Sequence, residues 1–490
     1  MDATSTVVLD NGGSTVKAGV VGTHPDPLLV PNAVVRSKGD KKNYVGHEYA
    51  QCSDYSSLHF RLPLEKGLVT DWDAQKAVWD VIFSEDLLKL DTQQSSLLLT
   101  EPYFNLPNLQ STYDQFIFEE YEFKSYCRRT PASCVPYGSL FAQPDSPPPE
   151  CTLILDCGFS FSHVVPVING HVQWKAVRRV DVGGKLLTNH LKELVSFRQW
   201  NMMDQTAVIN HVKETCCFVS LDFAKDLERA RQGSSKPIEY VLPDLTQSPH
   251  GHLKSANAMD LDNSQVLLMG NERFSVPELL FTPSDIGLEQ AGIAHAVAAS
   301  ISALPEDLRG MFWANIGLVG GSTRFSGFKQ RLMLELERLA PTDCEVVIYE
   351  SDDPTTAAYH GAYAFASSPD FPQHVITRAE YLEQGSRRHD DCWRPVGEAQ
   401  TPGRGRVRQQ DGRERQVQNG RARQADDERS TTDGGSGSER SSSSSSEEPE
   451  RPARGRRKSL KGESSRTQQG TQPSGPVRRR GRPPKHAGPT

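Results

Sequence analysis

Two stretches of the sequence each end an apolar run with an aspartate and continue with glycine. Val7–Ser14 reads VVLDNGGS and Leu153–Ser160 reads LILDCGFS, and a second β-rich run follows each of them. Such a pair predicts two β-hairpins whose glycine-rich tips expose backbone N–H groups, the chemistry that binds phosphate oxygens. One Asp-x-Gly after a strand is usually an ordinary turn. Two matched copies favour a phosphate site.

The aspartates that end the two strands are Asp10 and Asp156. Both would face the same phosphates, and Mg²⁺ keeps most of its waters while taking one or two carboxylates. We therefore expect Asp10 and Asp156 to hold a hydrated Mg²⁺ through water. The alternative for Asp10 is a plain solvated turn.

A third glycine-rich element, Gly317–Thr323 (GLVGGST), lies between an apolar run and a helix expected from Phe328. Adjacent glycines let the backbone approach a flat ligand closely. A tight strand-to-helix turn would use the same residues, and the sequence of this element alone does not separate the two interpretations.

The elements that must position these residues alternate between short β-rich runs and amphipathic stretches, which predicts an α/β fold. We expect strands at TVVLD, SLLLTE, CTLILD, NIGLVGG and CEVVIY, and helices at Asp73–Leu90, Leu186–Phe197, Ala207–Phe218 and Phe328–Leu339. In the last helix, apolar residues recur on one face.

The chain has 490 residues and a formal net charge of -7, which hides two different segments. Residues 386–490 carry 24 Lys and Arg against 14 Asp and Glu, a net +10, which leaves -17 for residues 1–385. Few sizeable apolar residues follow Trp393, so we expect a domain over 1–385 and a disordered tail over 386–490.

The same composition argues against secretion and membrane insertion. No run of about 18 apolar residues is present, and the start MDATSTVVLD lacks the regions of a signal peptide. The nine Cys show no spacing typical of a zinc site, which indicates reduced thiols in a cytosolic or nuclear protein.

Taken together, the glycine-rich elements resemble those of the actin family. The similar stretches are LDNGGSTVKAG, LDCGFSFSHVVP, VGGSTRFSGF, RLPLEKGLVTDWD, VKETCCFVSLDF and GNERFSVPELLFTPSDIGLEQAGI, and the resemblance extends over nearly all of residues 4–385. It implies the duplicated, ribonuclease H-like ATPase fold, with two lobes around a nucleotide cleft.

Within that family, Thr100–Gln110, Phe118–Phe123 and Val182–Glu214 look like the actin-related protein 6 group. The resemblance implies a nuclear protein, with some in the cytoplasm, that is a subunit of a Swr-type remodeller depositing the variant histone H2AZ. The implied partners are the motor subunit, the other subunits of that complex and the nucleosome.

The resemblance also assigns roles to single residues. ATP or ADP with Mg²⁺ would be held by Asp10, Asn11, Gly12, Gly13, Ser14, Lys17, Asp156, Gly158, Ser160, Lys213, Glu214, Gly320, Gly321, Ser322 and Phe325. Lys213 and Glu214 would flank the adenosine on one side. For Glu214 the alternative is a solvated helix face.

Departures from the actin pattern imply that nucleotide hydrolysis is very slow or absent. Phe159 occupies the place of a second aspartate, and an aromatic ring can neither accept a proton nor orient water. No glutamine occurs in Cys134–Ala142, so Gln143 is the nearest candidate for orienting water. His163 is retained from the actin pattern. Thr355 occupies the place of an actin lysine near the purine, which implies a reduced affinity for the nucleotide.

Two further departures concern assembly. Pro31–Gly46 is too short to contain the loop that actin inserts into the next filament subunit, so we expect no homopolymer. An inserted region over Arg231–Ala258 is either a partner-binding surface or a passive loop.

The tail contains a short basic motif at 478–485 that resembles an AT-hook. Its residues Arg478, Arg479, Arg480, Gly481, Arg482, Pro483 and Lys485 suit the narrow minor groove of A/T-rich DNA. A nuclear-import signal or a solvated tail would have a similar composition.

Other functions remain as alternatives to a non-catalytic scaffold. An actin-like ATPase that hydrolyses ATP or assembles on its own would need an ordered water that Phe159 does not hold. A small-molecule kinase of the same fold would need sugar-site carboxylates, and no such signature is present.

Overall fold

The computed structural model describes residues 5–144, 147–245, 249–254 and 265–385. The expected tail over 386–490 and its AT-hook-like motif lie outside these residues. In the described ranges, no helix has the length and apolar character that crossing a membrane requires.

The first six-stranded sheet contains the first expected hairpin. Its strand order is β20-β10-β9-β1-β2-β3, with β1 antiparallel to β2 and parallel to β9, and Asp10 on β1 lies opposite Lys17 on β2. The strands are β1 (Thr6–Asn11), β2 (Thr15–Val20), β3 (Leu28–Pro31), β9 (Ser96–Thr100), β10 (Ser125–Arg129) and β20 (Ile376–Thr377). The predicted hairpin is confirmed.

The second sheet repeats this arrangement. Its order is β13-β12-β11-β18-β19, with β14 also pairing β12; β11 is antiparallel to β12 and parallel to β18, and Asp156 lies opposite His163. The strands are β11 (Cys151–Cys157), β12 (Ser162–Ile168), β13 (His171–Val172), β14 (Arg178–Val180), β18 (Ile316–Val319) and β19 (Ile348–Tyr349). The internal repeat seen in the sequence is therefore a structural repeat.

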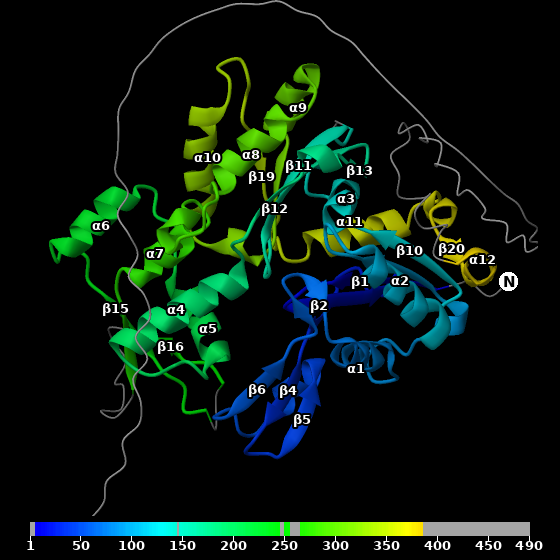
Figure 1. The fold of residues 1–490 in the computed structure, drawn as a ribbon, viewed down its shortest axis with the longest axis horizontal. Coiled ribbons are helices and arrows are strands. Elements are labelled where there is room, and N and C mark those ends of the chain that lie inside the picture. Colours follow the sequence, from blue (N-terminus) through cyan, green and yellow to red (C-terminus); the bar gives the residue numbers. More distant parts are fainter. Residues whose placement is uncertain (1–4, 145–146, 246–248, 255–264, 386–490) are drawn as a thin grey trace, which may run out of the picture. The chain divides into compact units, whose positions relative to one another are not determined.

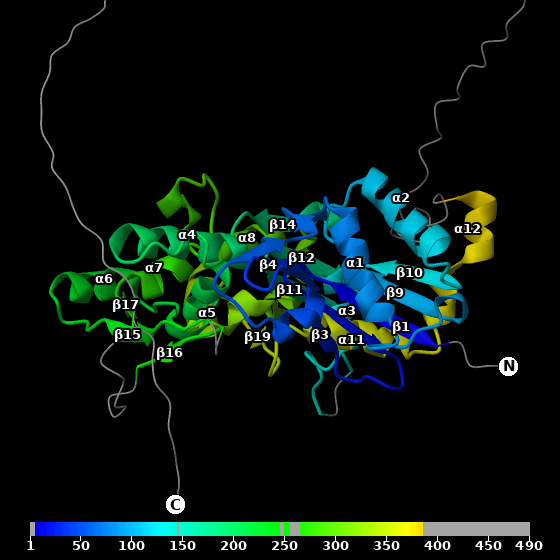
Figure 2. The same cartoon turned by 90° about the horizontal axis from the view of Figure 1, so that it is seen from below.

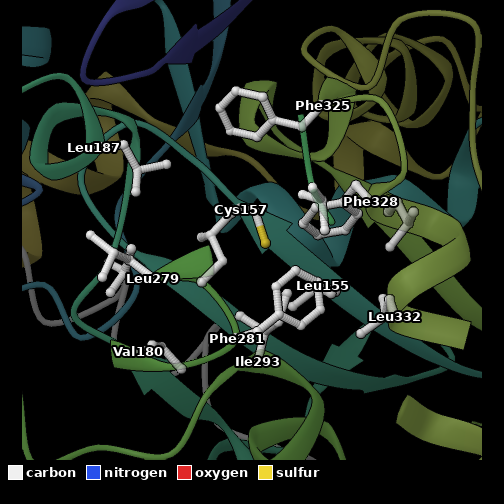
Figure 3. Close-up of a cluster of buried hydrophobic side chains, with 14 of the residues drawn as sticks. Leu155, Cys157, Val180, Leu187, Leu279, Phe281, Ile293, Phe325, Phe328 and Leu332 are labelled. Carbon is white, nitrogen blue, oxygen red and sulfur yellow. The ribbon is translucent and has the colours of Figure 1, made fainter. Parts of the chain in front are cut away.

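Helices cover both sheets (Figures 1 and 2). They are α1 (Trp72–Phe83), α2 (Pro107–Gln115), α3 (Pro131–Cys134), α4 (Gly184–Arg198), α5 (Thr206–Cys216), α6 (Phe223–Arg231), α7 (Glu272–Glu278), α8 (Ile293–Ser302), α9 (Arg309–Trp313), α10 (Phe328–Leu339), α11 (Ala357–Ala366) and α12 (Arg378–Gln384). The predicted helix over Phe328–Leu339 is confirmed as α10 with the same first and last residues. Phe328, Leu332 and Leu336 are buried in the core of the second sheet, and Figure 3 shows Phe328 and Leu332 there.

Smaller sheets extend from each half. On the first half are the sheet β5-β4-β6 and the hairpin β7-β8, made of β4 (Val34–Ser37), β5 (Lys42–Val45), β6 (Leu58–Arg61), β7 (Leu64–Glu65) and β8 (Leu68–Val69). On the second half is the sheet β16-β15-β17, made of β15 (Ile238–Val241), β16 (His252–Leu253) and β17 (Val266–Met269). The inserted region is thus built partly of strands rather than being a plain loop.

Among the elements that end earlier or begin later than predicted, two show a local cause. The expected helix over Asp73–Leu90 ends at Phe83, because Ser84 leaves the helical conformation and its hydroxyl donates to the Val81 carbonyl at 2.8 Å. The strand expected over Cys344–Tyr349 is reduced to β19, because the Cys344 N–H turns back to the Pro341 carbonyl.

Candidate functional site

Asp10 and Asp156 occupy equivalent positions at the ends of equivalent strands. Asp10 is 5% exposed and accepts a hydrogen bond from Thr100 Oγ1 at 2.6 Å. Lys17 Nζ lies 3.3 Å from the other carboxylate oxygen of Asp10. Asp156 accepts a hydrogen bond from the Tyr103 hydroxyl at 3.1 Å. Each carboxylate is therefore oriented by a neighbour from the segment that ends β9 or follows it.

The protonation of Asp156 depends on its surroundings. Burial raises the pKa of Asp156 to about 6, and the negative charge of Asp10 acts in the same direction, against the hydrogen bond from Tyr103. Two nearby carboxylates in a poorly hydrated place disfavour the charged form. A divalent cation would offset that cost.

The glycine-rich turns after the two strands approach each other. A Cβ atom on Gly13 would lie 3.0 Å from Ser160 Oγ and 3.4 Å from Phe159 Cδ1, and one on Gly12 would lie 2.7 Å from the Thr15 carbonyl oxygen. Side chains at these glycines would close the space between the turns. Ser14 is exposed at the tip of the first turn, and Gly158 begins the second. The structure thus brings the two predicted phosphate loops together.

Asn11 has a different role from the one expected. Its amide donates to Gln75 Oε1 at 3.1 Å, and its carbonyl oxygen accepts from Trp79 Nε1 at 3.4 Å. The Asn11 side chain therefore points into the packed base of the hairpin and anchors it to α1, instead of reaching toward the turns.

Lys213 lies beside the second phosphate loop rather than on an open helix face. The residue is 5% exposed, and its ammonium donates to Thr188 Oγ1 and Asn210 Oδ1, both at 2.9 Å. Burial lowers its pKa. Glu214 is exposed and accepts a hydrogen bond from Asn210 at 2.8 Å. Asn210 thus links the two neighbouring charged residues on α5.

The third glycine-rich element also borders the second loop. Gly320 has a φ of +95°, and a Cβ there would lie 2.5 Å from the Cys157 carbonyl oxygen, so only glycine fits. A Cβ added to Gly321 would lie 3.6 Å from the methyl group of Thr355. Ser322 is buried in the turn, and the buried Phe325 belongs to the large core cluster (Figure 3). The element is therefore both a tight turn and a neighbour of the phosphate loops.

Phe159 lies at the meeting point of the loops, where its carbonyl accepts a hydrogen bond from the Lys185 N–H at the start of α4. Gln143 instead donates to the Tyr349 hydroxyl at 2.7 Å, beside β19. The His163 ring packs against Tyr103 at a tilt of 48°, with ring centroids 4.5 Å apart, and burial lowers the pKa of His163 to about 3. His163 is therefore neutral at neutral pH.

Cys157 is enclosed in the core of the second half (Figure 3). Burial raises the pKa of its thiol to about 12. Because the thiolate is the reactive form, this cysteine is inert at neutral pH. The eight cysteines in the described residues are all free thiols.

Sequence reasoning missed Thr100 and Tyr103. The predicted strand at SLLLTE could have pointed to Thr100 and Tyr103. The carboxyl ends of parallel neighbouring strands meet at one edge of a sheet, so residues at the end of this strand would lie near the end of the strand that carries Asp10. A strand parallel to β1 therefore had to bring its end toward Asp10.

The site fits a nucleotide with hydrated Mg²⁺. Within the described ranges, no group of three or more His, Cys, Asp or Glu could enclose a metal ion. Two carboxylates on matched strands suit an ion that keeps most of its waters. Asp10 and Asp156 would hold that ion, and the turns around Gly13 and Gly158 would face the phosphates.

Comparisons with known proteins identify the family to which the chain belongs. The family model described as Actin matches residues 1–391. An Actin-like protein ARP6 from Cryptococcus neoformans is 47% identical over 404 residues, which cover 78% of this chain and 82% of that protein. The Actin-like protein ARP6 of Yarrowia lipolytica is 41% identical, over 78% of this chain and 95% of its own length. Actin-related protein 6 of Drosophila melanogaster is 37% identical, over 78% and 98%.

Proposed function

Because the chain belongs to the actin family and, within it, to the actin-related protein 6 group, we propose that it is a nucleotide-binding scaffold subunit of a Swr-type chromatin remodeller. In this role it assists the deposition of histone H2AZ in the nucleus without turning over ATP. The observation that carries the proposal is the pair of matched hairpins with Asp10 and Asp156 at their ends.

Nucleotide binding follows from the residues at these hairpins. Bound Mg²⁺ would neutralise phosphate charge next to Asp10 and Asp156. Backbone N–H groups at the tips of the two turns would donate to phosphate oxygens. The N–H groups of Gly12 and Gly158 themselves donate within the turns, to the carbonyls of Asp10 and Phe161 at 3.1 and 3.0 Å. Lys17 is held beside Asp10, where its ammonium adds a positive charge at the same place.

Three side chains support the proposal that the protein does not hydrolyse ATP. Phe159 lies where the two turns meet and offers no proton acceptor. Gln143 is engaged with Tyr349. His163 is buried and neutral. None of these three side chains offers a carboxylate or a free amide to orient an attacking water, so the nucleotide would serve as a bound structural cofactor.

The proposal also covers self-assembly and DNA binding. The β4–β5 hairpin connects Ser37 to Lys42 by a short turn, which supports a monomer that enters a complex instead of a filament. The basic motif over 478–485 would bind A/T-rich DNA, with most of its affinity from phosphate contacts.

Purified full-length protein tests the biochemical part of the proposal. After desalting, it should retain ATP or ADP with Mg²⁺, release no phosphate above a no-protein control and stay in the supernatant under conditions that polymerise actin. Steady phosphate release, or sedimentation as a polymer, would instead favour the alternative of an actin-like ATPase.

A further inference from the structure

Tyr103 lies in the segment that follows β9, yet its side chain packs against the second sheet. The residue is 7% exposed and shares a buried cluster with Ile154 on β11 and Val165 on β12. The Ala132 N–H donates to its hydroxyl oxygen at 3.1 Å, and the hydroxyl donates to Asp156 Oδ2 at 3.1 Å. The donor of this hydroxyl and one of its acceptor sites are therefore both in use.

The two partners of the Tyr103 hydroxyl are also the partners that a bound water would need. Asp156 Oδ2 could accept a hydrogen bond from a water, and the Ala132 N–H could donate one to it. An enclosed water is held by roughly two to four such polar groups. The hydroxyl thus occupies a position whose chemistry suits a water molecule.

The two carboxylate oxygens of Asp156 have different surroundings. A Cβ added to Gly158 would lie 3.5 Å from Asp156 Oδ1, so this oxygen faces the second phosphate loop. Oδ2 is the oxygen that accepts the hydrogen bond from Tyr103. The carboxylate therefore keeps one oxygen toward the loop, where a hydrated cation would be bound, while the other is engaged by the phenol.

The ring of Tyr103 also covers a neighbour of Asp156. His163 lies opposite Asp156 in the pairing of β11 with β12. The ring centroid of Tyr103 is 4.5 Å from that of His163, and the rings of Phe161 and Phe104 lie 6.0 and 6.5 Å from the same imidazole. Three aromatic rings around His163 make its surroundings unfavourable for water.

We propose that Tyr103 is a water-excluding residue, whose hydroxyl and ring take the place beside Asp156 and His163 that an attacking water would otherwise occupy. The inference rests on the proposed nucleotide site and extends the roles given to Phe159 and Gln143. In hydrolysis the water oxygen joins the γ-phosphorus, ADP leaves with the electron pair of the broken P–O bond, and the water proton passes to an acceptor. Because Tyr103 engages Oδ2 of Asp156, this oxygen is withheld from such a water.

Hydrogen exchange of the ligand-free, full-length protein tests the position of the hydroxyl. Tyr103→Phe retains the ring but removes the acceptor of the Ala132 N–H. Since one hydrogen bond is lost, the peptide that contains Ala132 should exchange about 3- to 10-fold faster. Tyr381→Phe is the matched control, because Tyr381 is 8% exposed and its hydroxyl donates to Glu119 at 2.7 Å, in the core of the first sheet. Its Ala132 peptide should exchange as in the wild type.

Single-turnover phosphate release tests the functional consequence. The probe is γ-labelled ATP bound with Mg²⁺ to the full-length protein. Tyr103→Leu retains an apolar core side chain but vacates the space of the hydroxyl and the far end of the ring. A positioned proton acceptor typically contributes about 10²- to 10⁴-fold, and Phe159 still offers none, so release should be about 10-fold faster than in the wild type, or more. Tyr381→Leu should release phosphate at the wild-type rate.

The outcomes separate this inference from the proposed function. Equal phosphate release from Tyr103→Leu and Tyr381→Leu, with nucleotide bound to both, would overturn the role of Tyr103 and leave the nucleotide site intact. Unchanged exchange of the Ala132 peptide in Tyr103→Phe would also overturn it, and this readout decides the matter if Tyr103→Leu does not fold. A wild type that retains no nucleotide, or one that hydrolyses it steadily, would overturn the proposed function together with the inference.

Discussion

The raised pKa of Asp156 predicts how pH changes two quantities: the stability of the ligand-free protein and its proposed affinity for nucleotide with Mg²⁺. Its folded pKa of about 6 lies above the ordinary value of 3.8, so folding favours the protonated form. The stabilising contribution is complete below about pH 3.8 and is lost as pH rises through 6. A bound cation favours the ionised carboxylate. The affinity for nucleotide with Mg²⁺ should therefore increase from pH 5 to pH 7, as measured by titration with etheno-ATP.

Asp156→Asn should separate these two effects. The substitution removes a partly buried charge whose ionised form is disfavoured in the folded state, so the free energy of unfolding of the ligand-free protein at pH 8 should rise by about 1–3 kcal/mol. It also removes a carboxylate beside the cation, so nucleotide should stabilise the variant less than the wild type. Thermal unfolding with and without Mg²⁺-ATP measures both quantities.

The control for this experiment is Asp343→Asn, because Asp343 is exposed. It should change neither quantity. A variant at Asp156 that is less stable at pH 8, yet binds nucleotide as the wild type does, would contradict the role assigned to this carboxylate.

At the scale of elements, the turn after β18 determines how closely the third glycine-rich element approaches the second phosphate loop. Gly320→Ala would combine a φ of +95° with a contact of 2.5 Å to the Cys157 carbonyl oxygen. We expect it to lower the free energy of unfolding by about 2–4 kcal/mol. Denaturant unfolding measures this loss.

Gly233→Ala provides the comparison, because Gly233 has a φ of +70° but no atom lies within 4 Å of an added Cβ. Its cost should be only the backbone strain of about 1 kcal/mol. Equal losses in the two variants would mean that the approach to Cys157 contributes nothing.

The sequence predicted the elements that repeat or show a clear period. The matched Asp-x-Gly runs predicted both hairpins, and the apolar face of Phe328–Leu339 predicted α10 to the residue. It did not predict the end of α1, which depends on one hydrogen bond of Ser84. It also did not predict that Asn11 turns toward Gln75, because that orientation depends on packing against α1.

A contact between the two halves, in which Gln205 Nε2 donates to the Ser56 carbonyl at 3.0 Å, was likewise hidden in the sequence. Gln205 and Ser56 are 149 positions apart and form no motif. By contrast, Asp10, Asp156 and Gly13 were proposed from the sequence because phosphate chemistry requires their residue types, and Gly320 because adjacent glycines let a flat ligand approach the backbone. Residues whose type is required by a chemical role can thus be proposed from a single sequence, whereas residues that matter through a tertiary contact are identified only from the structure.

At the scale of the whole molecule, the charge difference between the acidic domain and the basic tail predicts where DNA would bind. Replacing Arg480 and Arg482 by alanine in the full-length protein should weaken binding to an A/T-rich duplex. Each lost phosphate contact should reduce the steepness of the salt dependence by about 0.9. Fluorescence anisotropy over a range of salt concentrations measures both changes.

Arg404 and Arg406, also in the basic tail, supply the matched double substitution to alanine. That variant should bind the A/T-rich duplex more tightly than the variant of Arg480 and Arg482. Equal weakening by the two pairs would indicate a diffuse basic tail and not a minor-groove motif.

The assembly state in the cell tests the scaffold role most directly. The full-length chain, tagged in its source cells, would be purified from nuclear extract, sized under native conditions and analysed for the proteins that accompany it. We predict a large complex that contains a Swi/Snf-type motor ATPase and histone-binding subunits. Recovery as a free monomer or as a homopolymer would contradict the account.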